Sequence, residues 1–187
     1  MGSSMRIITG QARGVRLRTP EGLDTRPTSE MTKEAVFSMV HFELEGAVFL
    51  DLFAGSGQMG LEALSRGAKK AYFVDQGRQA QECIRENLLK AKLRERSTVV
   101  SMDALSFLRG CRENFDIAFL DPPYETGLMQ QVLPEVALRM SENGIILCET
   151  QRNEELPEQV GDFVMGKPHR YGKAKITVYR RKGGDED

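Results

Sequence analysis

The stretch VFLDLFAGSGQMG, residues 48–60, indicates the fold. Its first six residues form a nearly continuous apolar run, which is typical of a parallel β-strand buried on both faces. Gly55, Gly57 and Gly60 follow in the G-x-G-x-x-G spacing, and a helical pattern begins directly after them. In a strand–loop–helix unit, glycines at this spacing let the backbone approach a nucleotide closely. The stretch therefore predicts a nucleotide-binding α/β domain.

Strand-like and helical segments alternate along the rest of the chain. The expected strands are Ala71–Asp75, Thr98–Met102, Phe115–Asp121 and Gly144–Thr150, and the expected helices between them are about 78–90, 104–109 and 127–140. Two later strands, Gly161–Gly166 and Ala174–Tyr179, have no helix between them, so we expect them to pair antiparallel at one edge. The pattern predicts a Rossmann-like fold with a mostly parallel seven-stranded sheet and helices on both faces.

The first 45 residues are expected to form a small extension ahead of this domain. Residues 6–9 and 15–19 resemble two short strands joined by a glycine-containing turn, and a helix is expected from Ser29 to about Phe42. We therefore divide the chain into a hairpin-and-helix extension at 5–45 and a main domain at 46–182. The opening MGSS, residues 1–4, is interpreted as a vector remnant, and residues 183–187 as a disordered tail.

The composition is that of a globular domain. With 187 residues, of which 40% are hydrophobic, the chain suits one folded domain. It has no apolar run near the roughly 20 residues that a membrane span needs, and no signal peptide opens it. Cys83, Cys111 and Cys148 are far apart and lack metal-ligand spacing, so we expect buried thiols, no metal site and a reducing, cytoplasmic compartment.

Basic residues gather at both ends of a chain whose net charge is −1. Residues 5–20 contain four arginines and no acid, and residues 167–182 contain seven basic residues and no acid. This distribution predicts a localised patch for a polyanion such as RNA, although ordinary solvated strand surface would produce the same charges. The expected RNA contacts are Arg6, Arg13, Arg16, Arg18, Lys173 and Lys175.

Acidic residues near the expected strand ends bear on which nucleotide binds. Asp75, at the end of the strand after the glycine loop, can accept hydrogen bonds from a ribose diol, which suits a nicotinamide dinucleotide and S-adenosylmethionine (SAM) equally. Asp51 lies inside the preceding strand, where it could orient the loop or meet an ammonium group, and Asp103 is placed to reach an adenine amine. The positions of Asp51 and Asp103 therefore favour SAM over a nicotinamide dinucleotide as the ligand.

The stretch FLDPPYE, residues 119–125, ends a strand in a rigid turn that is rich in hydrogen-bond acceptors. Pro122 and Pro123 end the strand because proline donates no backbone hydrogen bond. Asp121 and the Pro122 carbonyl could accept both N–H bonds of a nucleobase amine, which would localise the nitrogen lone pair for attack on a methyl group. Tyr124 offers a face on which an unpaired base can stack. The catalytic candidates are Asp121, Pro122, Pro123 and Tyr124, and this chemistry needs no metal.

Three motifs together resemble the RsmD family of bacterial SAM-dependent methyltransferases, which modify a guanine N2 in 16S ribosomal RNA. They are LDLFAGSGQMGLEALSRGA (50–68), RPTSEMTKEAVFSMV (26–40) and FDIAFLDPPY (115–124), and the similarity extends over nearly the whole chain. The resemblance implies a methyltransferase domain at 46–182 with a SAM site formed by Arg26, Thr28, Asp51, Gly55, Ser56, Gly57, Asp75 and Asp103. It also implies that Asp121–Tyr124 hold the guanine amine and that the partner is 16S rRNA, within the small ribosomal subunit or its precursor. Asp75 stands where the family often has glutamate.

Other functions fit part of this pattern. An N6-adenine methyltransferase acting on DNA or RNA uses the same turn, although such DNA enzymes usually carry a separate target-recognition domain. A protein glutamine methyltransferase typically has asparagine at the position of Asp121, and a nicotinamide-dependent oxidoreductase would leave the DPPY turn without a role. A non-catalytic RNA-binding module would need neither Asp75 nor Asp103. We therefore expect an rRNA guanine-N2 methyltransferase, with the modified nucleotide, the assembly state of the substrate and the oligomeric state left open.

Overall fold

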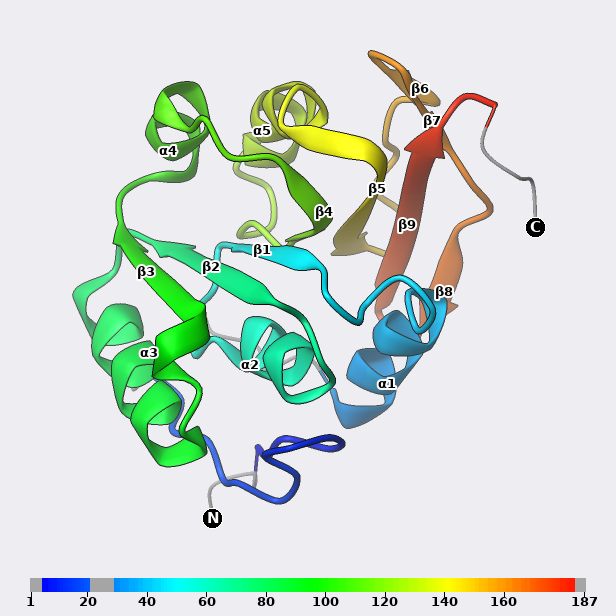
Figure 1. Cartoon of the computed structure of the whole chain (residues 1–187). Coiled ribbons are helices and arrows are strands. Elements are labelled where there is room, and N and C mark those ends of the chain that lie inside the picture. The colour runs from blue at the N-terminus through cyan, green and yellow to red at the C-terminus, as the bar shows by residue number, and fades with distance from the viewer. Residues whose placement is uncertain (1–4, 21–28, 184–187) are drawn as a thin grey trace.

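The computed structural model describes residues 5–20 and 29–183, which fold into three layers. Figure 1 shows one sheet with α1 (Glu30–Met39), α2 (Gln58–Ser65) and α3 (Arg78–Ala91) on one face and α4 (Ala104–Gly110) and α5 (Leu128–Ala137) on the other. A short 3₁₀ helix, η1 (Arg94–Arg96), follows α3. The segment interpreted as a vector remnant, 1–4, lies outside the described residues, as do residues 184–187 of the predicted tail.

The sheet has nine strands in the described part of the chain. They are β1 (Val48–Leu52), β2 (Lys70–Asp75), β3 (Ser97–Ser101), β4 (Phe115–Leu120), β5 (Met140–Gln151), β6 (Gln159–Val160), β7 (Phe163–Met165), β8 (His169–Tyr171) and β9 (Ala174–Arg181). Their order is β3-β2-β1-β4-β5-β9-β7-β6, with β8 paired to β9. The first five strands are parallel, and β9 runs antiparallel to β5 and β7. The predicted Rossmann-like sheet with an antiparallel edge is confirmed, and the short strands β6 and β8 extend it beyond the seven expected.

Each strand of the parallel half contributes side chains to two hydrophobic cores, one on each face of the sheet. In β1, for example, Phe49 packs with residues of α1, α2 and α3, while Leu50 and Leu52 pack with residues of α4 and α5. Because both faces are covered by helices, these strands read in the sequence as continuous apolar runs rather than alternating ones.

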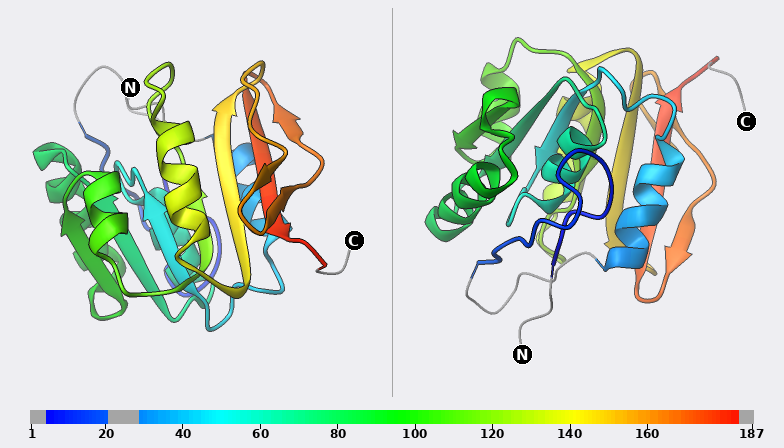
Figure 2. Two further views of the ribbon diagram at one scale, coloured as in Figure 1. Left: turned by 90° about the horizontal axis from the view of Figure 1, so that it is seen from above. Right: turned by 60° about the horizontal axis from the view of Figure 1, so that its bottom comes forward.

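The position of β1 decides where a site can form. β1 pairs with β2 on one side and with β4 on the other, so the sheet grows in opposite directions from it. The helices that follow β1 and β2, namely α2 and α3, cover one face, and those that follow β3 and β4, namely α4 and α5, cover the other, as the views in Figure 2 show. In such sheets the loops at the carboxyl ends of the two central strands diverge and leave a crevice between them.

Residues 5–20, called the arm below, form a hairpin that lacks the two strands predicted for residues 6–9 and 15–19. Within the described arm, only Arg6 and Arg16 make a β-bridge. Its two segments are still joined by backbone hydrogen bonds, from Ile7 N to Val15 O at 2.9 Å and from Leu17 N to Met5 O at 2.8 Å, while Ile8 N and Thr9 N donate to the Glu62 carboxylate of α2 at 2.8 and 3.2 Å. Pairing within the arm is therefore short, and contact with α2 supplies further backbone bonds.

The arm and α1 share the hydrophobic core of the main sheet. Ile7 and Leu17 of the arm are buried in the same cluster as Val36 and Phe37 of α1 and the β1 side chain of Phe49. The right-hand view in Figure 2 shows the arm running across α2. The described residues of the extension predicted at 5–45 therefore pack on the main domain and share its core.

Two further expectations need adjustment. The helix predicted to reach Met140 ends at Ala137, because Met140 already belongs to β5 and pairs with Phe115. Cys83 and Cys148 are buried thiols as expected, whereas Cys111 is partly exposed. Within residues 5–20 and 29–183, the structure contains no helix with the length and apolar character to span a membrane.

Candidate active site

Four carboxyl groups lie along the carboxyl edge of the parallel strands. Asp51 lies in β1, Asp75 ends β2, Asp121 directly follows β4, and Glu149 lies near the end of β5. These strands are neighbours in the order β2-β1-β4-β5. The sheet thus brings together three predicted site residues and adds Glu149, which the sequence analysis missed. An acid inside the apolar run GIILCET is the same signal that drew attention to Asp51.

The glycine loop, residues 53–57, turns the chain from β1 into α2. It uses left-handed backbone conformations, with φ of 66° at Phe53, 58° at Gly55 and 81° at Gly57. A β-carbon on Gly60 would come within 2.4 Å of the Phe73 ring, so only glycine lets α2 pack this closely on β2. A β-carbon on Gly55 would meet nothing within 4 Å. The loop therefore borders open space next to the N-terminus of α2, which is the arrangement that receives a nucleotide in this fold.

Asp51 is buried beneath the loop with 2% of its surface exposed. Its carboxylate accepts a hydrogen bond from Gly60 N at 3.0 Å, which is the loop-orienting contact predicted as one of its two roles. Burial raises the pKa of Asp51 to about 8, although the Gly60 bond lowers it. A cation bound at this edge would stabilise the ionised form of such a group.

Of the two other acids predicted for the cofactor, Asp75 ends β2 and Asp103 follows β3. Asp75 accepts hydrogen bonds from Gly55 N at 2.9 Å and Gly77 N at 2.8 Å, so it braces the glycine loop that it adjoins. Asp103 is exposed and caps α4 by accepting a hydrogen bond from Ser106 N at 3.0 Å. Hydrogen bonds from Ser106 lower the pKa of Asp103, so it is an anion at neutral pH. The two predicted residues Arg26 and Thr28 lie outside the described residues.

A buried amide, Asn87 of α3, joins the arm to the glycine loop. Its Nδ2 donates to the carbonyl oxygens of Arg18 and Ser56 at 2.8 and 3.0 Å, and its Oδ1 accepts from Arg18 N at 2.8 Å. At the other end of the arm, Ser56 Oγ donates to Met5 Sδ at 3.4 Å. One end of the arm therefore contacts Ser56, a residue predicted to line the SAM site, and the other end is joined to Ser56 through Asn87.

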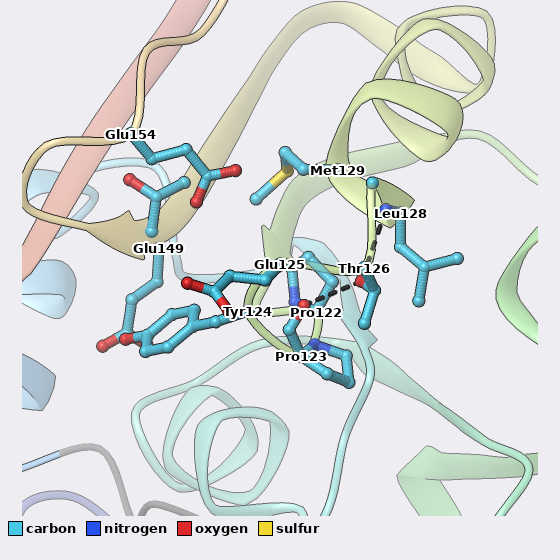
Figure 3. Close-up of a pocket in the computed structure, with 11 residues that line it drawn as sticks. Pro122, Pro123, Tyr124, Glu125, Thr126, Leu128, Met129, Glu149 and Glu154 are labelled. Carbon is cyan, nitrogen blue, oxygen red and sulfur yellow. Dashed lines mark hydrogen bonds between the residues drawn. The ribbon is translucent and has the colours of Figure 1, made fainter.

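The DPPY turn leaves β4 and leads into α5 through two residues with left-handed backbone, Glu125 and Gly127, whose φ values are 62° and 73°. Thr126 Oγ1 donates to Pro123 O at 2.8 Å and fixes the turn. Pro122 is buried, and Tyr124 is half-buried. Figure 3 shows the resulting pocket, which Tyr124 lines together with Pro122, Pro123, Glu125, Glu149 and Glu154.

Asp121 and Glu149 form a hydrogen-bonded pair of carboxyl groups at the base of this turn. The pairing of Leu120 with Cys148 in the β4–β5 ladder places the two acids one residue further along neighbouring strands. Burial, followed by the negative charge of Glu149 and the hydrogen bond to it, raises the pKa of Asp121 well above the usual value. Asp51 adds a smaller effect in the same direction, so the cofactor side and the turn are close enough to interact electrostatically.

The residues predicted to contact RNA differ in their availability. Arg13 and Arg16 of the arm and Lys173 of the β8–β9 turn are exposed. Arg6 and Arg18 are exposed but form ion pairs with Glu30 at 3.0 Å and Glu86 at 2.7 Å.

Lys175 does not fit its predicted role. It is 8% exposed, and its ammonium group donates to the Glu154 carbonyl. Lys175 lies in β9 opposite the buried Thr150 of β5, so its side chain is directed into the protein and away from the surface where RNA would bind.

Comparisons with known proteins agree with this geometry. Residues 5–180 match the model of the family described as Conserved hypothetical protein 95. The chain is 37% identical over 184 residues to YlbH of Bacillus subtilis, a match that covers 96% of the chain and 100% of that protein. It is 32% identical over 184 residues to ribosomal RNA small subunit methyltransferase D of Escherichia coli, covering 97% of the chain and 92% of that protein. The solved structure of yhhF from Escherichia coli superposes with a TM-score of 0.85 at 32% identity, over 95% of this chain and 98% of that one.

Proposed function

Because the chain belongs to the family described as Conserved hypothetical protein 95, the RsmD family, we propose that it is a SAM-dependent methyltransferase of ribosomal RNA. Its target is the exocyclic N2 of a guanine in small-subunit (16S) rRNA, presented in the small subunit or its precursor. The observation that carries this proposal is the placement of the glycine loop and the DPPY turn after neighbouring strands, β1 and β4, with Asp51 electrostatically linked to both Asp75 and Asp121.

The cofactor side fits a compact cationic nucleoside. Open space beside Gly55 leaves room for the ligand, and the partly exposed Asp75 carboxylate adjoins that space, where it can accept hydrogen bonds from a ribose. Asp103 is an exposed anion that can accept a hydrogen bond from an adenine amine. When bound, SAM supplies an electrophilic methyl group on a positively charged sulfur. The negative charge of Asp51, when ionised, favours that cation.

The DPPY turn binds the amine of the target base and makes its nitrogen a better nucleophile. Asp121 and the Pro122 carbonyl accept the two N–H bonds of the base, and Tyr124 stacks on its ring. Pro122 and Pro123 restrict the backbone, so the acceptors are in place before the base arrives and little reorganisation is needed.

The choice of guanine N2 and of the small subunit rests on the resemblance of the motifs and on the name of the Escherichia coli relative. The acceptor pair of the DPPY turn would serve an adenine N6 as well. In this proposal the exposed Arg13 and Arg16 of the arm and Lys173 of the β8–β9 turn bind RNA phosphates, and residues 5–45 act as a substrate-binding extension of a methyltransferase domain at 46–182.

The test is methyl transfer from radiolabelled SAM to small ribosomal subunits, and to naked 16S rRNA, purified from cells that lack the corresponding methyltransferase. Digestion of the labelled RNA and chromatography of its nucleosides should give N2-methylguanosine. Label in N6-methyladenosine would contradict the assignment of the base, and label in neither nucleoside would contradict RNA methylation. Calorimetry with SAM and with NAD distinguishes a methyltransferase from an oxidoreductase, because only SAM should bind.

A further inference from the structure

Glu149 is a buried acid next to the predicted catalytic turn for which the proposed function has so far assigned no role. It is 6% exposed and lines the same pocket as Pro122 and Tyr124 (Figure 3). Its carboxyl group is hydrogen-bonded to that of Asp121. Since the two acids leave neighbouring parallel strands at the same level, the contact is a consequence of the β4–β5 register.

Two carboxyl groups in hydrogen-bond contact share a proton. A hydrogen bond between them requires a donor, so one must be protonated, and burial makes a second negative charge in the same place costly. The pair therefore carries one proton and one negative charge over a range of pH. This range is bounded by two macroscopic titrations that belong to the pair as a whole.

Other ionisable groups lie near the pair. The bonds that each of them makes show which group acts directly on the protonation of Asp121. These groups are Asp51 from β1, Tyr124 and Glu125 from the DPPY turn and Glu154 from the loop after β5, while Lys175 of β9 lies opposite Thr150, the residue after Glu149. Lys175 is bonded to the Glu154 carbonyl, and Asp51 is bonded to Gly60 N. Glu149 is the group that bonds directly to Asp121.

We propose that Glu149 is a positioning residue that shares a proton with Asp121 and thereby enables Asp121 to accept the proton that the base amine loses during methylation. The inference rests on the proposed function and deepens it. Asp121 receives the amine proton on one oxygen while its other oxygen passes the shared proton to Glu149.

The step balances in atoms and charge. The amine nitrogen forms one N–C bond with its lone pair, and the methyl–sulfur bond breaks with its electron pair left on sulfur. The nitrogen then releases one proton to the carboxyl pair, whose charge changes from −1 to 0. The pair returns to −1 when Glu149 releases a proton to solvent through the pocket. Without Glu149, Asp121 must itself be ionised before it can accept a proton.

The variant Glu149→Gln tests this because the amide keeps the size of the side chain and cannot take the proton. The matched control is Glu155→Gln, which removes an exposed acid from the loop after β5. Carboxyl ¹³C NMR of aspartate-labelled and glutamate-labelled protein reads the titrations directly and does not depend on methyl transfer. Rates of methyl transfer are then measured against pH, alongside SAM affinity and thermal stability.

In the parent and in Glu155→Gln, Asp121 and Glu149 should titrate together with two shared midpoints. In Glu149→Gln, Asp121 should titrate once, at a pH between those two midpoints. The acid limb of the rate profile should move to higher pH, and the rate on the acid side should fall at least about tenfold. SAM affinity and melting temperature should stay close to those of the parent.

An acid limb that stays in place in Glu149→Gln, or an Asp121 titration that is the same with and without Glu149, would overturn the proposal. Asp121→Asn gives a second, independent reading, since Glu149 should then titrate once. Two midpoints for Glu149 in that variant would also refute the shared proton. If the parent methylates no RNA, the proposed function fails, while the shared titration remains testable by NMR.

Discussion

Replacement of Asp51 by asparagine should stabilise the protein at mildly alkaline pH. Asp51 is buried in β1 with 2% of its surface exposed, and its pKa is raised from 3.8 to about 8. Between these values, position 51 is protonated in the folded protein and ionised in the unfolded chain. The folded state therefore binds the extra proton, so the free energy of unfolding falls as pH rises from about 4 to about 8 and is flat above that range.

The size of the effect follows from the shift. One pKa unit corresponds to about 1.4 kcal/mol, so Asp51 lowers the free energy of unfolding by roughly 4 kcal/mol between pH 5 and pH 8. Asparagine has no proton to lose in this range, and its amide oxygen can still accept the hydrogen bond that Gly60 N donates to Asp51.

Urea unfolding at pH 5 and pH 8 measures this difference. The parent should lose about 4 kcal/mol more than Asp51→Asn between the two pH values. Asp121, whose pKa is also raised, contributes to the decline in both proteins, so the comparison isolates Asp51. Glu142→Gln, which removes an exposed acid from β5, should decline as the parent does. The reasoning is refuted if Asp51→Asn loses stability as steeply as the parent.

Three further changes test the site and the arm. Asp121→Ala should lower the methyl-transfer rate by roughly two to three orders of magnitude, with SAM affinity measured by calorimetry nearly unchanged, because this carboxyl is assigned to the base. A joint loss of SAM binding would contradict that assignment. Replacing Arg13 and Arg16 by alanine should flatten the slope of log affinity against log salt for single-stranded RNA by roughly 1.4 units, at about 0.7 per contact, and an unchanged slope would place RNA elsewhere. Asn87→Ala should lower the free energy of unfolding by about 2 kcal/mol or more, since it leaves buried groups of Arg18 and Ser56 unpaired. It should also weaken SAM binding through the glycine loop, and calorimetric affinity equal to that of the parent would rule out this coupling.

Much of the fold could be predicted from local patterns. The apolar run before Gly55 and the alternation of strands and helices depend on period and length, which are properties of neighbouring residues. They were sufficient to predict the parallel half of the sheet, its antiparallel edge, the position of Asp51 inside a strand and the positions of Asp75 and Asp121 at strand ends. Gly60 was recognised by spacing, and the structure supplies the reason, since the Phe73 ring leaves no room for a side chain.

Other features depended on segments that are distant in the sequence. The two strands predicted for the arm are reduced to one bridge, and the backbone donors of Ile8 and Thr9 bind Glu62 of α2 across more than fifty residues. The sequence predicted Lys175 to be a surface cation, whereas the β5–β9 pairing directs its side chain into the protein.

The pairing of Asp121 with Glu149 has the same origin. The sequence by itself determined that each acid stands at the end of a buried strand, because burial leaves a strong hydrophobic pattern. Only the tertiary structure decided that they meet, because the order and register of strands are set by packing between segments far apart in the chain. The charge that each carboxyl group carries depends on that meeting, since burial and a neighbouring acid, rather than the residue type, determine how tightly it holds a proton.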